Sequence, residues 1–452
     1  MKPHVHFIGI GGIGMSALAL WFRSQGWTVS GSDLTESELT RILRRENVKL
    51  TIGHDKRNLP EETKLIIRTQ AVSLKNPEYK EALRRRLVAL TYPEMIGELT
   101  RHYETLAVAG AHGKSTTTAM LALILKRAKL NPTTVVGTLL KELDGKNFEA
   151  GSSPYLVLEA DEYGRAFLHY SPALAVLTTI DKEHLDTYKN LAGIKTAFLA
   201  FLQNVKPHGI FVLNQDDEFI LSLKSQIAAI AKRKSIKTFW FKTKSKAGRL
   251  VKSVLQIPGS HNVSNALAAF TAAQALGTDK KTALAALKSY RGAWRRLELK
   301  GNFFGAPVYD DYAHHPTEIK ATLAALKDAY PERKIVCVFQ PHQAERLKAL
   351  FTDFKTAFDG ADETLILPLY HVTGREGAKN NVTSETLARA IQKQQPKKAL
   401  FYLREPEHIP HAIFALGDPA GKVIVMMGAG DIVNYTLKLL RAKPKRISLR
   451  AC

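Results

Sequence analysis

The residues of this chain best suited to chemistry lie in two glycine-rich segments of its first quarter. The first, Val5 to Gly14, reads VHFIGIGGIG and carries Gly9, Gly11 and Gly14 in the spacing G-x-G-x-x-G. Glycines so spaced allow a tight strand-to-helix turn and a close approach of backbone N–H groups to a diphosphate. Asp33, at the end of the next apolar run, suits a ribose or a base. A purely structural glycine turn has the same pattern.

The second segment, Thr105 to Thr118, reads TLAVAGAHGKSTTT. Val108 stands where the longer common phosphate loop has its first glycine, so this turn is short. The amides after Gly113 and the ammonium of Lys114 nevertheless suit phosphates, and the Ser115 hydroxyl suits a magnesium shell. The sequence therefore predicts a nucleoside triphosphate site separate from the first turn.

Two further polar groups follow apolar runs downstream of the second turn. Glu159 stands in LEADE and His184 in TIDKEHLDTY. Ligands of parallel α/β sheets bind at the carboxyl ends of the strands, so we expect both side chains near the phosphates. Carboxylate and hydroxyl oxygens suit a hard divalent ion, and His184 suits a second or softer metal such as manganese. The alternative is that both are solvated loop residues.

The elements that must position these groups alternate between strand and helix, which predicts an α/β fold with mainly parallel sheets. A chain of 452 residues is too long to fold around a single hydrophobic core, and its length indicates two to four domains. We place boundaries near 101–104 and 290–294. Expected strands lie at Val5–Ile10, Trp27–Asp33, Leu65–Ile67, Leu87–Leu90, Thr105–Ala109, Tyr155–Leu158, Ala173–Thr178, near Val308, and at Ile335–Phe339, Thr364–Pro368 and Val423–Met427. Expected helices include Met15–Ser24 and Thr116–Arg127.

The net charge of +23 is the compositional oddity. Lys232 to Lys252 holds nine basic and no acidic residues around Phe239, Trp240 and Phe241. Such a run is a nucleic-acid surface or, more commonly, a solvated face, and a basic surface also attracts phosphorylated substrates. The two cysteines, Cys337 and Cys452, indicate no disulfide framework and agree with a reducing cytoplasm. We find no secretory segment and no membrane-spanning run.

Taken together, these segments resemble the Mur ligases, the ATP-dependent amide-forming enzymes of peptidoglycan synthesis. Within that family the chain is most similar to the branch that joins L-alanine to UDP-N-acetylmuramate. The matching motifs are GIGGIGMS at Gly9, AGAHGKSTTT at Ala109, EADE at Glu159, IDKEHLDTY at Ile180, PGSHNVSNALAA at Pro258, RGAWRRLE at Arg291, YDDYAHHPTEIKATLAAL at Tyr309, FQPH at Phe339, GRE at Gly374 and MGAGDIV at Met427.

The resemblance implies three domains: a Rossmann-like domain for the UDP-sugar at 1–102, a P-loop-type ATPase domain at 103–293, and a second Rossmann-like domain at 294–452 that closes over ATP and amino acid. It implies that the lactyl carboxylate of UDP-N-acetylmuramate is activated as an acyl phosphate and then displaced by L-alanine, giving ADP and phosphate. ATP and Mg²⁺, with Mn²⁺ as an alternative, are the implied cofactors. We expect a cytoplasmic monomer or weak homodimer with no nucleic-acid or membrane partner.

The resemblance also assigns site residues. The catalytic residues it implies are Lys114, Glu159, His184, His314 and Arg346. Those for ATP are Gly110, Ala111, His112, Gly113, Lys114, Ser115, Thr116, Asn262, Asn265, Arg296 and Asp311. Those for the UDP-sugar and the amino acid are Gly11, Gly12, Ile13, Gly14, Asp33, Ser73, Tyr312 and His342. The metal ligands would be Ser115, Glu159 and His184.

Alternatives to this assignment come from three classes. Within the family, a recycling ligase adds a whole peptide to the same UDP-sugar. A nicotinamide-dependent oxidoreductase explains the first turn but leaves Lys114 without a role. A nucleic-acid-stimulated ATPase explains the charge but leaves the first turn without one. Gln343 replaces an arginine common in the family, so the choice among L-alanine, glycine and serine stays open.

Overall fold

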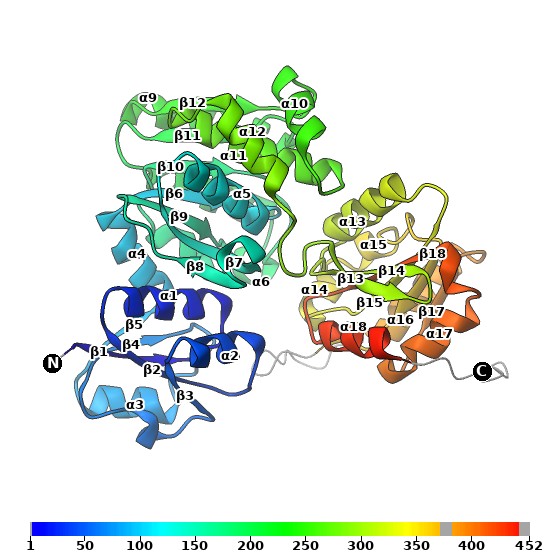
Figure 1. Cartoon of the computed structure of the whole chain (residues 1–452), viewed down its shortest axis with the longest axis horizontal. Coiled ribbons are helices and arrows are strands. Elements are labelled where there is room, and N and C mark those ends of the chain that lie inside the picture. The colour runs from blue at the N-terminus through cyan, green and yellow to red at the C-terminus, as the bar shows by residue number, and fades with distance from the viewer. Residues whose placement is uncertain (1, 371–381, 443–452) are drawn as a thin grey trace. The chain divides into compact units, whose positions relative to one another are not determined.

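The computed structural model describes residues 2–370 and 382–442. The GRE motif at Gly374 and Cys452 lie outside the described residues. Three β-sheets organise the chain (Figure 1), and most of their strand pairs are parallel. The expected α/β fold is therefore confirmed.

The first sheet has five parallel strands in the order β3-β2-β1-β4-β5. Because β1 lies in the middle and is buried throughout, the first glycine turn leaves the centre of the sheet. The strands are β1 (His4–Ile8), β2 (Thr28–Asp33), β3 (Lys49–Ile52), β4 (Thr63–Arg68) and β5 (Val88–Thr91). The helices are α1 (Ile13–Ser24), α2 (Glu38–Arg45), α3 (Pro77–Arg84) and α4 (Tyr92–His102), with η1 (Lys56–Asn58).

The second sheet has seven strands in the order β12-β11-β10-β6-β9-β7-β8, parallel except for the β7-β8 hairpin. The buried helix α5 packs on β6, β7 and β9. The strands are β6 (Glu104–Ala109), β7 (Thr133–Leu140), β8 (Lys146–Glu149), β9 (Tyr155–Ala160), β10 (Leu174–Leu177), β11 (Ile210–Asn214) and β12 (Lys237–Phe241). The helices are α5 (Lys114–Arg127), α6 (Leu185–Tyr188), α7 (Leu191–Gln203), α8 (Glu218–Ser222), α9 (Lys224–Lys234), α10 (Lys246–Val254), α11 (Ser260–Ala275) and α12 (Lys280–Ser289), with η2 (Lys141–Leu143) and η3 (Tyr163–His169).

The third sheet has six strands in the order β13-β14-β18-β15-β16-β17, and only β13 is antiparallel to its neighbour. Alternate residues of β15 and β18 enter two separate apolar clusters, so helices cover both faces. The strands are β13 (Glu298–Phe303), β14 (Ala306–Asp311), β15 (Lys334–Phe339), β16 (Glu363–Ile366), β17 (Ala399–Tyr402) and β18 (Lys422–Met427). The helices are α13 (Pro316–Ala329), α14 (Ala344–Ala349), α15 (Phe351–Phe354), α16 (Ser384–Gln394), α17 (Ile409–Ala415) and α18 (Ile432–Arg441), with η4 (Pro406–His408) and η5 (Pro419–Gly421).

Contacts between residues divide the chain into two compact units. The first unit comprises residues 1–183, 187–256 and 263–291 and contains the first two sheets. The second comprises residues 184–186, 257–262 and 292–452 and contains the third sheet. No helix in the described part of the chain combines the length and apolar character that crossing a bilayer requires.

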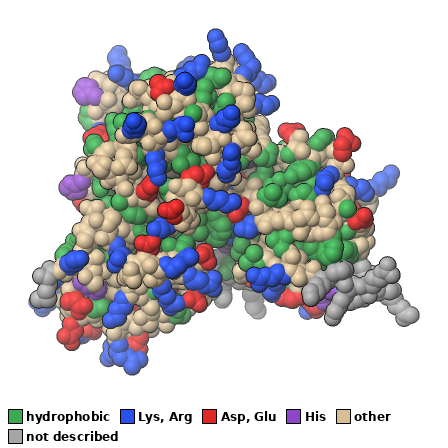
Figure 2. Space-filling model, in the orientation of Figure 1, with side chains coloured by type: hydrophobic (Ala, Val, Ile, Leu, Met, Phe, Trp, Pro, Cys, Tyr) green, Lys and Arg blue, Asp and Glu red, His purple; other side chains and the backbone are tan. Residues whose placement is uncertain are grey.

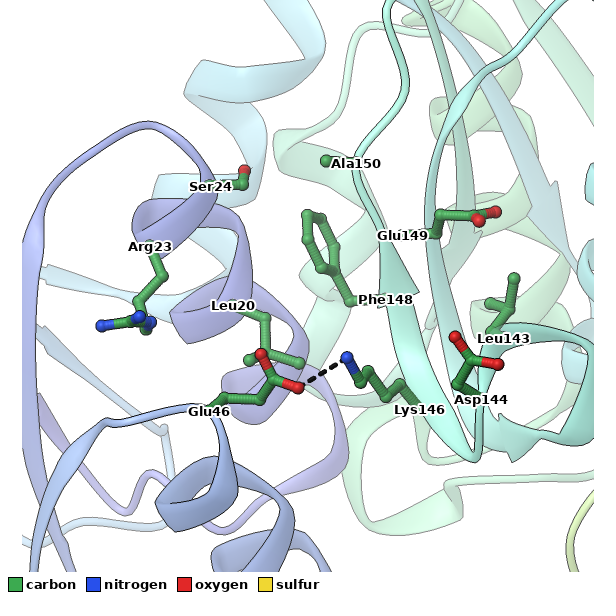
Figure 3. Close-up of a pocket in the computed structure, with 10 residues that line it drawn as sticks. All are labelled: Leu20, Arg23, Ser24, Glu46, Leu143, Asp144, Lys146, Phe148, Glu149 and Ala150. Carbon is green, nitrogen blue, oxygen red and sulfur yellow. Dashed lines mark ion pairs between the residues drawn. The ribbon is translucent and has the colours of Figure 1, made fainter.

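Within the first unit, α1 of the first sheet packs against the β7-β8 hairpin of the second. The Nδ2 of Asn147 donates to the Ile13 carbonyl at 2.6 Å and to the Ser16 hydroxyl at 3.0 Å. An ion pair of 2.5 Å joins Glu46 to Lys146 across a cavity of about 330 Å³ (Figure 3). The hairpin therefore holds the first turn of α1 in place.

The basic run 232–252 spans the end of α9, the edge strand β12 and most of α10. Phe241 is buried, Trp240 is half-buried, and Phe239 is 37% exposed. Lys and Arg side chains are prominent at the upper end of Figure 2, where Figure 1 places these elements. The aromatic residues of the run thus belong to an edge strand that is partly packed into the second sheet.

Candidate functional site

The first glycine turn connects β1 to α1 as its spacing predicts. Gly9 has φ of 79°, and its N–H and that of Ile10 donate to the Ser32 carbonyl at 2.8 and 3.0 Å. Gly12 is the N-cap of α1, so the amides of the first helical turn have no partner within the helix. Such amides, together with the helix dipole, favour an anion. The geometry therefore suits a diphosphate at Gly11, Gly12, Ile13 and Gly14.

Asp33 ends β2 beside this turn, and its carboxylate accepts a hydrogen bond from the Gly11 N–H at 2.7 Å. It consequently fixes the conformation of the turn. Ser73 is exposed in the loop between β4 and α3, where its hydroxyl accepts from the Lys75 N–H at 3.1 Å. Both predicted residues follow strands of the first sheet.

The second glycine turn connects β6 to α5 and is braced by the end of the adjacent strand β10. A Cβ on Gly110 would lie 2.0 Å from the Thr178 hydroxyl, and Gly113, the N-cap of α5, has φ of 83°. The Ala111 N–H donates to the Thr179 carbonyl, and the His112 N–H to the Thr179 hydroxyl, both at 2.9 Å. The ring of His112 lies 2.9 Å from Asp181. Ser115 and Thr116 are buried in the first turn of α5.

Lys114 folds back over its own turn and forms an ion pair with Glu162. Its Nζ lies 2.8 Å from the nearer carboxylate oxygen and 2.8 Å from the Gly110 carbonyl. Burial lowers the pKa of Lys114, but Glu162, Asp161 and Glu159 outweigh it and raise that pKa above its ordinary value. Burial raises the pKa of Glu162 to about 7, assisted by Asp161 and opposed by Lys114. A cation is thus held at the turn by a carboxylate that is nearly fully buried.

Glu159 lies in β9 next to the second turn, because β6 and β9 are neighbours. The Gly137 N–H donates to one oxygen of its carboxylate at 2.8 Å, and a Cβ on Gly137 would lie 2.2 Å from that oxygen. Its other oxygen accepts no hydrogen bond from the described residues. A carboxylate oriented in this way, together with a serine hydroxyl such as that of Ser115, is the kind of donor set that fits a hard divalent ion.

His184 lies in the segment that follows β10, directly before α6, and has φ of 53°. Contacts group residues 184–186 with the second unit, whereas Glu159 belongs to the first. Its predicted role as a metal ligand therefore stays a prediction.

The two predicted asparagines begin α11, as expected. Asn265 lies against the second turn, since a Cβ on Gly113 would be 2.1 Å from its Oδ1. Asn262 is buried, and its Nδ2 donates to the Pro258 carbonyl at 2.7 Å. Asn265 groups with the first unit and Asn262 with the second.

In the second unit, Asp311 ends β14 and accepts the N–H groups of Leu297 and Ala313 at 2.6 and 2.7 Å. Burial raises its pKa to about 6. The guanidinium of Arg296 lies 5.1 Å from the ring centre of Tyr312. Arg295 is 4% exposed, donates to the Gly428 and Gly430 carbonyls, and stands 3.9 Å from buried Asp310.

The remaining predicted residues form a cluster in the second unit. The rings of Tyr312 and His314 are 5.4 Å apart, and those of His314 and His342 are 6.1 Å apart. Arg346, in α14, lies 3.5 Å from Nδ1 of His342. Tyr370, which sequence reasoning missed, stacks on His342 with ring centres 5.6 Å apart. It was missed because it lies beyond β16 and outside the matched motifs, the nearest of which begins at Gly374.

The structure thus gathers the predicted residues into three groups. The first turn with Asp33 and the second turn with Glu159 and Asn265 belong to the first unit. Tyr312, His314, His342 and Arg346, with Arg296 and Asp311, belong to the second.

Three family models match consecutive parts of the chain. Their descriptions are Mur ligase family, catalytic domain, for residues 4–104; Mur ligase middle domain, for 108–273; and Mur ligase, glutamate ligase domain, for 295–430.

Curated relatives match over nearly the full length. The UDP-N-acetylmuramate--L-alanine ligase of Aquifex aeolicus is 38% identical, covering 96% of this chain and 97% of the relative. That of Caldicellulosiruptor bescii is 40% identical, covering 97% and 98%. Among solved structures, the UDP-N-acetylmuramate-alanine ligase of Thermotoga maritima has a TM-score of 0.79 at 28% identity, covering 97% and 98%. A murein peptide ligase of Psychrobacter arcticus has a TM-score of 0.72 at 24% identity, covering 99% and 100%, which shows the shared fold.

Proposed function

Because the chain belongs to the Mur ligase family, we propose that it joins L-alanine to the lactyl carboxylate of UDP-N-acetylmuramate, with ATP as the energy source, in peptidoglycan precursor synthesis. The near-full-length similarity to ligases of that name supports this substrate pair. The observation that carries the proposal is a pair of anion-binding turns in one unit, of which only the second has a lysine.

The second turn would hold the ATP phosphates through Gly113, Lys114, Ser115 and Thr116, with Gly110, Ala111 and His112 shaping the loop. Asn265 reaches the same turn and suits the nucleotide. Asn262 would meet the adenine, and Arg296 and Asp311 would meet a phosphate and the ribose. The first turn and Asp33, with Ser73, would hold the UDP moiety.

Glu159, Ser115 and His184 would hold Mg²⁺, with Mn²⁺ as an alternative. The free oxygen of the oriented Glu159 carboxylate supports this donor set. When bound, the ion supplies positive charge that stabilises the transferred phosphoryl group.

The chemistry has two steps. A lactyl carboxylate oxygen attacks the γ-phosphorus of ATP, the bond to ADP breaks, and an acyl phosphate forms. The amine of L-alanine then attacks the acyl carbon, phosphate leaves with the C–O bond pair, and the amine loses a proton. Lys114 would leave Glu162 to neutralise the phosphates, because a phosphoryl transition state needs positive charge held in place.

The cluster of Tyr312, His314, His342 and Arg346 would receive the amino acid. Arg346 suits an amino-acid carboxylate through a charge-assisted hydrogen bond. We further propose the domain limits 1–102, 103–293 and 294–452, and a cytoplasmic protein that is a monomer or a weak homodimer.

The test is phosphate release by the purified protein with ATP and Mg²⁺. We expect release only when UDP-N-acetylmuramate and L-alanine are both present, and a product whose mass equals the sum of the two minus water. Glycine and L-serine in parallel reactions define selectivity at Gln343. Faster turnover with a tripeptide than with L-alanine would assign the recycling reaction instead. Equal phosphate release without the sugar nucleotide would contradict both.

A further inference from the structure

Tyr92 is the first residue of α4, the helix that leads from the first sheet to the second. A capping box fixes its backbone, because the Thr91 N–H donates to the Glu94 carboxylate at 2.7 Å. β5 is parallel to β4 and β4 to β1, so the end of β5 reaches the same edge of the sheet as the first glycine turn. Tyr92 thus starts beside that turn.

The phenol ring of Tyr92 packs directly on the first glycine turn. A Cβ added to Gly14 would lie 2.6 Å from Cζ of Tyr92 and 2.7 Å from its hydroxyl oxygen. Both distances are shorter than van der Waals contact, so only glycine fits at position 14 while the ring stays there. The hydroxyl therefore lies at the proposed diphosphate site.

The same hydroxyl also lies close to the acidic end of β9. Asn147 of β8 donates a hydrogen bond to the Ile13 carbonyl of the first turn. The neighbouring strand β7 carries Gly137, whose N–H donates to the Glu159 carboxylate. This chain of contacts brings the first turn toward Glu159. Consistently, burial raises the pKa of Tyr92, and the charges of Glu159 and Asp161 raise it further. The same two carboxylates and Tyr92 act on buried Tyr170.

No hydrogen bond joins the Tyr92 hydroxyl to any other residue in the described ranges. The side chain is half-buried, so its hydroxyl is left to bind water or a ligand. A tyrosine phenol is protonated at neutral pH, and burial with the neighbouring carboxylates raises its pKa further, so the hydroxyl can donate a hydrogen bond. The first glycine turn, which we propose binds a diphosphate, lies on one side of the hydroxyl, and the carboxylates of Glu159 and Asp161 lie on the other.

We propose that Tyr92 is a substrate-contacting residue whose hydroxyl donates a hydrogen bond to an anionic oxygen of the sugar nucleotide between the first turn and Glu159. This proposal rests on the function proposed above and extends it. The oxygen belongs to the diphosphate or to the lactyl carboxylate, two groups of the same chemistry. The contact would hold the carboxylate end of the substrate in line with the second turn.

The test compares Tyr92→Phe with Tyr103→Phe. Both changes remove one phenolic oxygen from the same helix, and Tyr103 is at its other end, about 16 Å away along the axis. The Tyr103 hydroxyl accepts from the Trp21 indole at 3.3 Å and faces neither turn. Melting curves establish that both variants fold. Calorimetric binding of UDP-N-acetylmuramate and of UDP is measured for each, followed by kcat and KM.

For Tyr92→Phe we expect kcat/KM for UDP-N-acetylmuramate to fall about tenfold or more, as for a lost hydrogen bond to a charged group, with KM for ATP unchanged. Weaker binding of UDP as well assigns the contact to the diphosphate, and unchanged binding of UDP assigns it to the carboxylate. Tyr103→Phe should match wild type. Wild-type binding and kinetics in Tyr92→Phe would overturn the inference alone. A wild-type protein that binds UDP-N-acetylmuramate but does not use it would overturn the proposed reaction, and the binding comparison would still decide the role of Tyr92.

Discussion

The two glycine turns of the first unit are built differently. The first has no lysine or arginine between Gly9 and Gly14, and neighbours hold it in place: Asp33 at Gly11, Asn147 at Ile13 and Tyr92 at Gly14. The second carries Lys114, which forms an ion pair with Glu162. A turn without a cation depends on shape, whereas a turn with a cation depends on where its charge is placed.

This difference suits the two roles. A diphosphate that remains intact needs only a fixed set of N–H donors. A phosphoryl group that is transferred gains charge in the transition state, and a nearby cation stabilises it. Changes to the second turn should therefore affect turnover most, and changes to the first should affect packing and substrate binding.

The largest effect is expected for Lys114→Ala. Turnover should fall at least about a hundredfold to a thousandfold, because the turn from Gly110 to Thr116 has no other lysine or arginine to supply this charge. Phosphate release with all substrates present measures it. Lys126→Ala is the matched control, since Lys126 lies in the last turn of the same helix and pairs with Glu149 at the surface. Retained turnover in Lys114→Ala would mean that the second turn does not carry the chemistry.

Gly14→Ala should be next in size and should act through packing. The new Cβ would meet the Tyr92 ring, so we expect a loss of about 1–3 kcal/mol in the free energy of unfolding, measured as a lower Tm. Gly12→Ala gives the stability control, because its Cβ would meet only ordinary contacts, the nearest at 3.6 Å. Adding Tyr92→Ala to Gly14→Ala should give less than the sum of the two losses. Equal melting of the Gly12 and Gly14 variants would show that the Tyr92 ring moves freely.

The sequence predicted most of the fold because strand and turn signals are local. The expected strands at Trp27–Asp33, Thr105–Ala109 and Val423–Met427 match β2, β6 and β18 to within one or two residues. Strand β12 was not expected, because Lys237–Phe241 lies within the basic run 232–252, which we interpreted by its charge. An edge strand tolerates that composition.

Motifs select Lys114 and Glu159, and the structure places them at the start of α5 and in the strand next to β6, while their roles stay predictions. The site was not predictable where a residue acts across the fold. Long-range contacts define three such residues. Glu162 contacts Lys114, 48 positions away, and Asn147 contacts Ile13, 134 positions away. Tyr92 packs on Gly14 of the first turn. Arg295 is similar, since its burial depends on carbonyls of Gly428 and Gly430. Long-range contacts of this kind leave no periodic pattern.

The smallest expected effect is a difference in how the stability of the protein depends on pH near the two turns. One buried carboxylate near each turn, Glu78 and Glu162, causes it. Near the first turn, Glu78 is fully buried and accepts hydrogen bonds from Ser32 at 2.5 Å and from Asn58 at 2.8 Å, besides His6 and His54. Burial alone would raise its pKa, but these bonds outweigh it and lower the pKa well below the ordinary value. At the second turn, burial raises the pKa of Glu162 to about 7. The two groups therefore contribute stability with opposite dependence on pH.

For Glu162, the folded pKa exceeds the unfolded value of 4.5, so its contribution is present in full below 4.5 and is lost as the pH rises through about 7. The quantity to follow is the free energy of unfolding of the wild type minus that of Glu162→Gln. This difference should fall from pH 4.5 to 7, by no more than about 1.4 kcal/mol per pH unit, and should stay constant at higher pH. For Glu78 the sign reverses: its contribution is present above 4.5 and is lost on acidification. Melting of wild type, Glu162→Gln and Glu78→Gln from pH 4 to 8 measures both. A Glu162 difference that grows with pH would contradict the raised pKa of Glu162 and would mean that Lys114 keeps this carboxylate charged over the whole range.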